Sequence, residues 1–240
     1  MSDKVQDVAE AVGADVEELF EALSAGRRRQ RQDASHQLAI IAHQDPTKLH
    51  DHTDELVDAL YRPEAQTRWE VLDALSEVVS EKADVLDGAY DGAETSLFDE
   101  SSSTVRLAAF RFLTRYGATS LERSDRVWGI VDEAIQCYHG DPDYRDMLGC
   151  LRDFARGDVS ADTRKALVTR VKFDADSGRG FVKLLSEEII DISKAVEKEA
   201  KRAAREKAVP GDGETRPAKK ATRKKATKAA DEEEASSSAE

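Results

Sequence analysis

Apolar side chains recur along this chain at helical intervals, and the whole pattern repeats about every 38 residues. An arginine opens each copy, and apolar residues follow it three, six or seven, and ten positions later. The four arginines are Arg31, Arg68, Arg106 and Arg145, so that successive copies are separated by 37, 38 and 39 residues. Such a period is typical of stacked helix pairs, each too small to bury its apolar face alone. The pattern therefore predicts an all-α superhelix (an α-α solenoid) of about four to five helix pairs.

Glycine, proline and capping residues divide the pattern into helices. Two short helices are expected within residues 3–24, separated at Gly13, and further helices over 28–42, from Pro46, from Pro63 and over 161–172. The helix around residues 85–98 is expected to be interrupted near Gly92, and Gly117 is expected to be a C-cap. A loop is expected from Asp174 to Gly180, before a long last helix. Almost no segment alternates as a strand would.

The last helix changes character midway. Its first part carries leucine, isoleucine and Phe181, which we expect to dock on the rest of the domain, whereas its second part carries only alanine among charged residues. Beyond Pro210 the composition is of low complexity. We therefore predict a helical repeat domain over residues 1–195, a projecting charged helix over 196–209, and a disordered, basic and then acidic tail over 210–240.

The net charge of −13 is unevenly distributed. Residues 1–190 carry 23 Lys and Arg against 38 Asp and Glu, whereas residues 191–230 carry 13 against 6. An acidic body repels phosphate backbones, so any nucleic-acid binding would belong to the C-terminal part. The sequence has neither an apolar run that could span a membrane nor a secretion signal. We interpret Cys137 and Cys150 as reduced, half-buried core residues and expect a cytoplasmic protein without a membrane interaction.

One stretch of the chain resembles a HEAT repeat, a pair of antiparallel helices with an aspartate near the turn and a Val-Arg pair opening the second helix. The matching residues are Asp99, Val105, Arg106, Ala108, Ala109, Leu113 and Gly117, and Asp141 with Arg145 begins a weaker copy. The resemblance covers roughly residues 15–195. It implies a non-catalytic scaffold that holds a protein partner on a concave face built from the second helices of the pairs.

The repeated arginines have two interpretations. Arg31, Arg68, Arg106 and Arg145 could pair with acids such as Asp99 and Asp141 in their own or a neighbouring turn, which would fix how one repeat stacks on the next. Alternatively, they could line the concave face and bind an acidic partner. We favour the stacking role.

Four histidines lie close together in the sequence, at His36, His43, His50 and His52, with aspartates nearby. Imidazole and carboxylate groups can bind zinc or nickel. His50 and His52 point apart on a helix, however, and the chain has no HxxxH pair, so solvated surface histidines are the better interpretation. No cofactor or metal is expected.

The sequence carries none of the common catalytic motifs, such as GxSxG, HExxH or the Walker loop, so we expect no enzyme. DNA-alkylation-repair glycosylases share the HEAT-like architecture and use a cleft with tryptophan, aspartate and arginine. Trp69 and Trp128, the two tryptophans of this chain, do not match that spacing, so a glycosylase of this kind is only a minor alternative.

The tail offers a second functional hypothesis. Its cations resemble those of the lysine-rich tails of histone-like proteins, and they are Arg216, Lys219, Lys220, Arg223, Lys224, Lys225 and Lys228. Such arms bind phosphates through counterion release. The chain is therefore expected to be a protein-interaction scaffold or, as the alternative, a nucleic-acid-associated protein whose tail binds weakly and without sequence preference. A purely solubilising tail is also compatible with the sequence.

Overall fold

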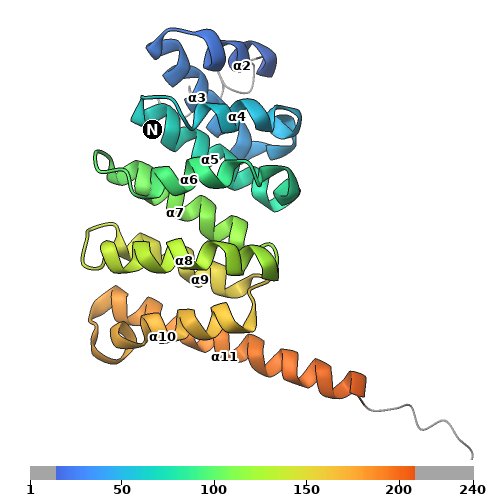
Figure 1. Cartoon of the computed structure of the whole chain (residues 1–240), viewed down its shortest axis with the longest axis vertical. Helices are drawn as coiled ribbons and strands as arrows, with labels where there is room; N and C mark the ends of the chain where they lie inside the picture. The colour runs from blue at the N-terminus through green and yellow to red at the C-terminus, as the bar shows by residue number, and fades with distance from the viewer. Residues whose placement is uncertain (1–14, 209–240) are drawn as a thin grey trace, which may run out of the picture.

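The computed structural model describes residues 15–208, and this part of the chain forms helices stacked in pairs along one axis (Figure 1). The first helices of the pairs are α2 (Val16–Ala25), α4 (Thr53–Ala59), α6 (Ala89–Leu97), α8 (Leu121–Cys137) and α10 (Ala161–Ser177). The second helices are α3 (Arg28–Gln44), α5 (Ala65–Lys82), α7 (Ser103–Gly117), α9 (Tyr144–Arg156) and α11 (Gly180–Ala208). Short 3-10 helices, η1 (Pro46–His52) and η2 (Ala83–Leu86), precede α4 and α6.

The predicted all-α superhelix is confirmed for these residues, which include no strand. Each second helix packs on the second helix of the next pair, from α3 through α5, α7 and α9 to α11. The buried apolar residues form one continuous cluster from Phe20 in the first pair to Ile189 in the last. The hydrophobic core is therefore shared between neighbouring pairs, as the sequence period requires.

Side chains that bind free backbone amides fix where several helices begin. Asp15, Ser102, Ser120 and Ser160 each accept a hydrogen bond from an amide two or three residues further on, and Asp45 does the same for η1. These caps satisfy amide groups that the first turn of a helix leaves unpaired.

The predicted interruption at Gly92 is wrong. The break lies earlier, at Asp87 and Gly88 between η2 and α6, and Gly92 is a buried residue inside α6. A Cβ atom at position 92 would come within 2.9 Å of Leu60 Cδ1 in the preceding pair. Glycine at this position therefore allows two pairs to approach closely and does not end a helix.

The predicted loop from Asp174 to Gly180 is also wrong in its first half, because α10 continues to Ser177. Asp174 is buried, and its carboxylate accepts a hydrogen bond from the Tyr144 hydroxyl at 2.6 Å and contacts His139 Nε2 at 2.9 Å. His139 lies in the turn between α8 and α9, and Tyr144 is the first residue of α9. They hold the end of α10 in place although its sequence resembles a turn.

Three residues expected in the core are exposed. Cys137 lies at the exposed end of α8, and Phe181 and Leu184, expected to dock on the domain, are 57% and 50% exposed on α11. The predicted helix before Gly13 and the predicted tail over 210–240, with all of its cations, lie outside the described residues. In Figure 1, α11 extends beyond the stack of pairs.

Gly117 lies at a close contact between α7 and α8. A Cβ atom at this position would come within 2.4 Å of Val127 Cγ2 and 3.1 Å of Phe154 Cε2, and both neighbours are buried. Gly117→Ala should therefore lower the free energy of unfolding by about 1–3 kcal/mol through overpacking. Urea unfolding followed by circular dichroism measures this change.

Gly129, within α8, provides the matched control because a Cβ atom there would meet nothing within 4 Å. Gly129→Ala should raise the free energy of unfolding by about 0.5–1 kcal/mol through helix propensity. Equal effects of the two substitutions would contradict the close contact at Gly117.

Candidate functional site on the second helices

The arginines that open the sequence repeats contact the next pair in the stack. Arg31 forms an ion pair with Glu64, which immediately precedes α5, and Arg68 forms one with Asp99 at 2.7 Å, in the turn before α7. The other two use aromatic rings: Arg106 lies 4.9 Å from the ring centroid of Tyr138, and Arg145 lies 3.9 Å from that of Phe181. Each arginine thus meets the segment that leads into the second helix of the following pair, or the first turn of that helix.

The acids that sequence analysis assigned to these arginines differ in their contacts. Asp99 joins two repeats, because its side chain binds Arg68 and its carbonyl accepts a hydrogen bond from Arg106 Nη1 at 2.9 Å. Within the described residues, Asp141 pairs with none of the four arginines that open the repeats. Its backbone carbonyl accepts a hydrogen bond from the Tyr144 amide. The Tyr138 ring occupies the place beside Arg106 that an acid was expected to take.

Asp99 is electrostatically the most perturbed of these residues. Burial raises the pKa of Asp99, but hydrogen bonds from Ser101 and Arg68 outweigh it and lower the pKa to about 2. The carboxylate is therefore ionised at neutral pH and stabilises the folded chain through its partners.

A second set of ion pairs, which sequence analysis missed, joins residues one repeat apart. On the second helices, Asp73 of α5 pairs with Arg111 of α7 at 3.0 Å, and Glu77 pairs with Arg115 at 2.6 Å. Both separations are 38 residues. An acid followed by an arginine at the repeat length is the sequence signal that would have identified them.

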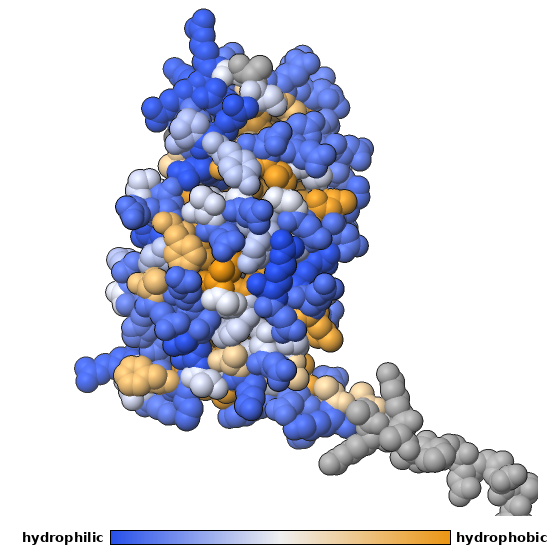
Figure 2. All heavy atoms as spheres, viewed as in Figure 1, coloured by the Kyte–Doolittle hydropathy of each residue, from blue (hydrophilic) through white to orange (hydrophobic). Residues whose placement is uncertain are grey.

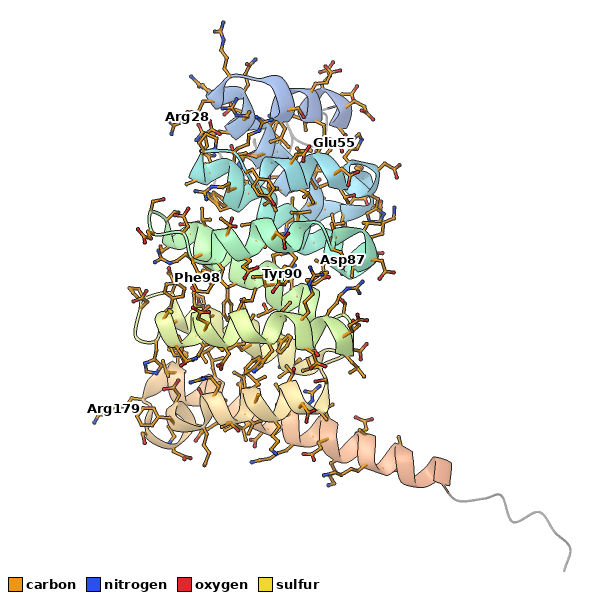
Figure 3. All side chains as sticks on the ribbon, in the orientation of Figure 1. Arg28, Glu55, Asp87, Tyr90, Phe98 and Arg179 are labelled. Carbon is orange, nitrogen blue, oxygen red and sulfur yellow. The ribbon has the colours of Figure 1, made fainter. Side chains whose placement is uncertain are left out.

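The first helices carry matching pairs. Asp132 of α8 binds Arg170 of α10 through two hydrogen bonds of 2.5 and 2.7 Å, across 38 residues. Arg126 lies 4.1 Å from the ring centroid of Tyr90, and Figure 3 shows Tyr90 and Asp87 between the third and fourth pairs. Contacts between residues about one repeat apart therefore join neighbouring pairs on both the first-helix and the second-helix side of the stack.

Histidines extend the charged row across the second helices. His36 Nδ1 lies 3.0 Å from Glu70 Oε1, and His43 lies 2.7 Å from Asp73 and 3.3 Å from Glu77. The carboxylates of α5 are therefore shared between histidines of α3 and arginines of α7. We call this surface the second-helix face; it is centred on His36, His43, Glu70, Asp73, Glu77, Arg111, Arg115, Cys150 and Leu184.

The two signs of charge lie at different depths on the second-helix face. The side chains of His43 and Arg115 are 51% and 44% exposed, whereas those of Asp73 and Glu77 are 14% and 24% exposed. Glu70 is buried, and burial together with nearby Asp73 raises its pKa despite the hydrogen bond from His36. The face thus presents imidazole and guanidinium groups to solvent, with carboxylates recessed behind them.

The other two clustered histidines lie apart from this face. His52 contacts Glu17 at 3.2 Å and Glu55 at 3.3 Å, and its ring stacks on Phe20 with centroids 4.3 Å apart. Nε2 of His50 is buried and has no hydrogen-bond partner among the residues that the structure describes. Sequence proximity therefore does not bring the four histidines together, and residues 15–208 contain no group of three His, Cys, Asp or Glu side chains arranged to hold a metal ion.

A groove of about 350 Å³ opens on the second-helix face between α5, α7 and α9. Its apolar lining consists of Val79, Ala118, Cys150 and Phe154. Its polar lining combines donors and acceptors, which are Ser76, Glu77, Ser80, Arg111, Thr114, Arg115, Thr119 and Asp153. Burial raises the pKa of the Cys150 thiol against the effect of nearby Arg111, so the thiol is neutral. The arrangement can hold a chain that offers both hydrogen-bonding groups and an apolar side chain.

Solved structures that share this fold include engineered helical repeat proteins. A designed armadillo repeat protein is 14% identical with a TM-score of 0.62, over 78% of this chain and 90% of its own. Another, in complex with the peptide (KR)4, is 14% identical with a TM-score of 0.63, over 80% and 86%. An engineered protein is 18% identical with a TM-score of 0.64, over 79% and 90%. No protein-family model and no curated protein matches the chain.

The fold thus defines a helical repeat protein. Within residues 15–208, the second and third repeats contain a short 3-10 helix besides their two α-helices, and the other repeats contain two α-helices. The helical repeat architecture is thus confirmed, and the HEAT type stays a prediction. None of the helices in this part of the chain combines the length and the apolar character that crossing a membrane requires.

The Arg68–Asp99 pair yields a prediction with a defined pH dependence. Arg68→Ala should lower the free energy of unfolding by about 1–2 kcal/mol at pH 7, because it removes one partner of a largely desolvated carboxylate. The pKa of Asp99 in the folded chain, about 2, lies below its ordinary value of 3.8, so the stabilisation that Asp99 contributes is fully present above pH 3.8 and is lost as the pH falls towards 2. The difference in the free energy of unfolding between wild type and variant should therefore narrow between about pH 4 and pH 2 in urea titrations.

Arg29→Ala is the matched control, because the Arg29 side chain is 93% exposed and, among residues 15–208, pairs only with Asp33 on its own helix. It should change stability by less than about 0.5 kcal/mol at either pH. A pH-independent effect of Arg68→Ala would argue against the ionised Asp99 as the relevant partner.

Proposed function

We propose that this chain is a non-catalytic scaffold that holds an extended peptide segment of a partner protein on its second-helix face. The observation that carries this proposal is the groove between α5, α7 and α9, where polar groups of both kinds surround an apolar floor. An extended peptide backbone offers one donor and one acceptor per residue, which is the complement of such a lining.

Arg111 and Arg115 are the principal donors. Each donates to α5 through Nη1: Arg111 to Asp73, and Arg115 to Glu77 and the Ser76 carbonyl. A guanidinium group has five N–H donors, so each arginine can remain attached to α5 and still donate to peptide carbonyls. Glu77 and Asp153 supply acceptors for peptide amides beside them.

The apolar part of the face would bind side chains. Val79, Ala118 and Phe154 line the groove. Exposed Leu184 follows Arg179 by five residues, as Arg111 follows Arg106 and Cys150 follows Arg145, so Leu184 takes the equivalent position on α11. Apolar anchors contribute most of the affinity in such interfaces, and the polar groups fix orientation.

Three further observations support this location. The second helices contact one another more extensively than the first helices do, as expected if they lie on the inner side of the curve of the stack. The similar structures include armadillo repeat proteins designed for modular peptide recognition and one in complex with a peptide. Figure 2, in the view of Figure 1, shows the side of the stack formed by the first helices α4, α6, α8 and α10. This surface is predominantly hydrophilic, with apolar residues confined to small patches.

Selection from a random peptide display library, followed by fluorescence polarisation with the selected peptides, tests the proposal. Arg115→Ala and Arg111→Ala should each weaken binding by about 10- to 100-fold, the loss expected for hydrogen bonds from a charged donor. Circular dichroism of each variant checks that the stack remains folded.

Lys172→Ala is the matched control, because Lys172 is an exposed cation on α10 whose ion-pair partner within the described part of the chain is Asp176, on the same helix. It should leave peptide affinity unchanged. Peptides that bind all three variants equally would place the binding surface elsewhere, and a failure to select any peptide would contradict the proposal.

A further inference from the structure

A second groove lies at the end of the stack, between the N-terminal half of α10 and the C-terminal half of α11. It has a volume of about 620 Å³ and is lined by Val159, Val168, Val196 and Ala200 among other residues. The two helices pack together along part of their length, and α11 then continues past the body of the stack (Figure 1). The groove is therefore bordered on one side by a helix that is itself accessible to a partner.

The net charge of this end differs from that of the rest of the described chain and the residues before it. Residues 1–158 carry 17 Lys and Arg against 33 Asp and Glu, whereas residues 159–203 carry 10 against 8. The first segment thus has a net charge of −16 and the second of +2. Two copies of the acidic part repel each other, and the last helix pair is the end at which they can approach without that repulsion.

The groove is lined by residues of opposite charge, spaced so that a second, antiparallel copy of the same helix can complement them. Asp162 and Lys165 lie three residues apart on α10, and Lys194 and Glu197 lie three residues apart on α11. If α11 of one copy lies antiparallel to α11 of another about a two-fold axis between residues 195 and 196, Lys194 of each copy faces Glu197 of the other. In a two-fold interface every such contact occurs twice.

The ion pairs that Lys194 and Glu197 form within one chain do not prevent these contacts between two copies. Lys194 contacts Asp191 at 3.7 Å and Glu197 pairs with Lys201, in both cases along the exposed surface of α11 itself. Such exposed pairs within a helix contribute little to stability.

We propose that the α10–α11 groove binds a second copy of this chain, in a two-fold dimer in which the α11 helices cross antiparallel at Val196. Val196 and Ala200 of each copy fill the groove of the other against Val168, and the Lys194–Glu197 contacts set the register. The dimer leaves the second-helix groove, which lies on α5, α7 and α9, outside its interface.

Other segments of the chain fit the groove less well. Residues 209–240 contain no leucine, isoleucine, methionine or aromatic residue, so they cannot fill an apolar groove. Residues 1–14 contain Val5, Val8 and Val12, but their insertion into another copy would join unlike ends and produce open chains of increasing mass. Mass measurements distinguish that outcome from a closed dimer.

Sedimentation equilibrium of the full chain tests the proposal directly. The apparent mass should rise with concentration from that of one 26.5 kDa chain to twice that value and no further. Val196→Glu should hold the mass at one chain throughout, because it places a carboxylate in the apolar part of the groove. Val85→Glu, at an exposed valine of η2, is the control that should still dimerise.

A mixing experiment tests the antiparallel register. Lys194→Glu and Glu197→Lys should each be monomeric alone, because each places like charges opposite each other. An equimolar mixture of the two variants should form heterodimers, because every charge of one variant then faces its opposite in the other. Changes within a single helix cannot produce this recovery, since mixing leaves both helices as they were.

Three results would overturn the proposal: a wild-type chain that stays monomeric at all concentrations, a mass that exceeds two chains, or single charge variants that gain nothing on mixing. Circular dichroism of each variant shows whether the fold is intact. Peptide affinity is measured separately, so that loss of the dimer and loss of peptide binding are distinguishable outcomes.

Discussion

The stability of the structure depends on contacts between residues that lie one repeat apart along the chain. A single helix pair buries too little apolar surface to be stable, so each pair must be completed by the next. The separation of 38 residues recurs in the Asp73–Arg111, Glu77–Arg115 and Asp132–Arg170 pairs, which lie on both sides of the stack. Apolar contacts supply the stability of this arrangement, and the repeated ion pairs favour one register of a repeat on its neighbour.

The sequence predicted the features that follow from periodicity, because the same physical environment recurs in every copy. The apolar positions after Arg31, Arg68 and Arg106 are buried, and those arginines lie at the junctions between repeats. Residues with non-repeating surroundings were harder to interpret. Gly92 resembles a helix breaker until Leu60 is known to lie against it, and Asp174 resembles a turn residue until Tyr144 is known to donate to it.

The candidate site was predicted in outline only. The HEAT resemblance indicated the second helices, but neither the groove nor its two arginines were identified, because a charged residue on a helix surface is usually solvated. The histidines were noticed as a cluster in sequence and are divided in space: His36 and His43 join the second-helix face, and His52 packs on Phe20. Side chains 30 or more residues apart decide these roles, and a local pattern carries no information about them.

Charge has two different uses in this molecule. Within the second-helix face, carboxylates are recessed behind arginine and histidine, so an acidic chain presents hydrogen-bond donors at its proposed binding groove. At the end of the stack, the balance of charges in α10 and α11 removes the repulsion that the rest of the body imposes. The two surfaces belong to different helices. If both proposals hold, one dimer carries two peptide grooves, and a partner with two copies of a binding segment can engage both at once. The gain in avidity then depends on whether the linker between those segments spans the distance between the grooves.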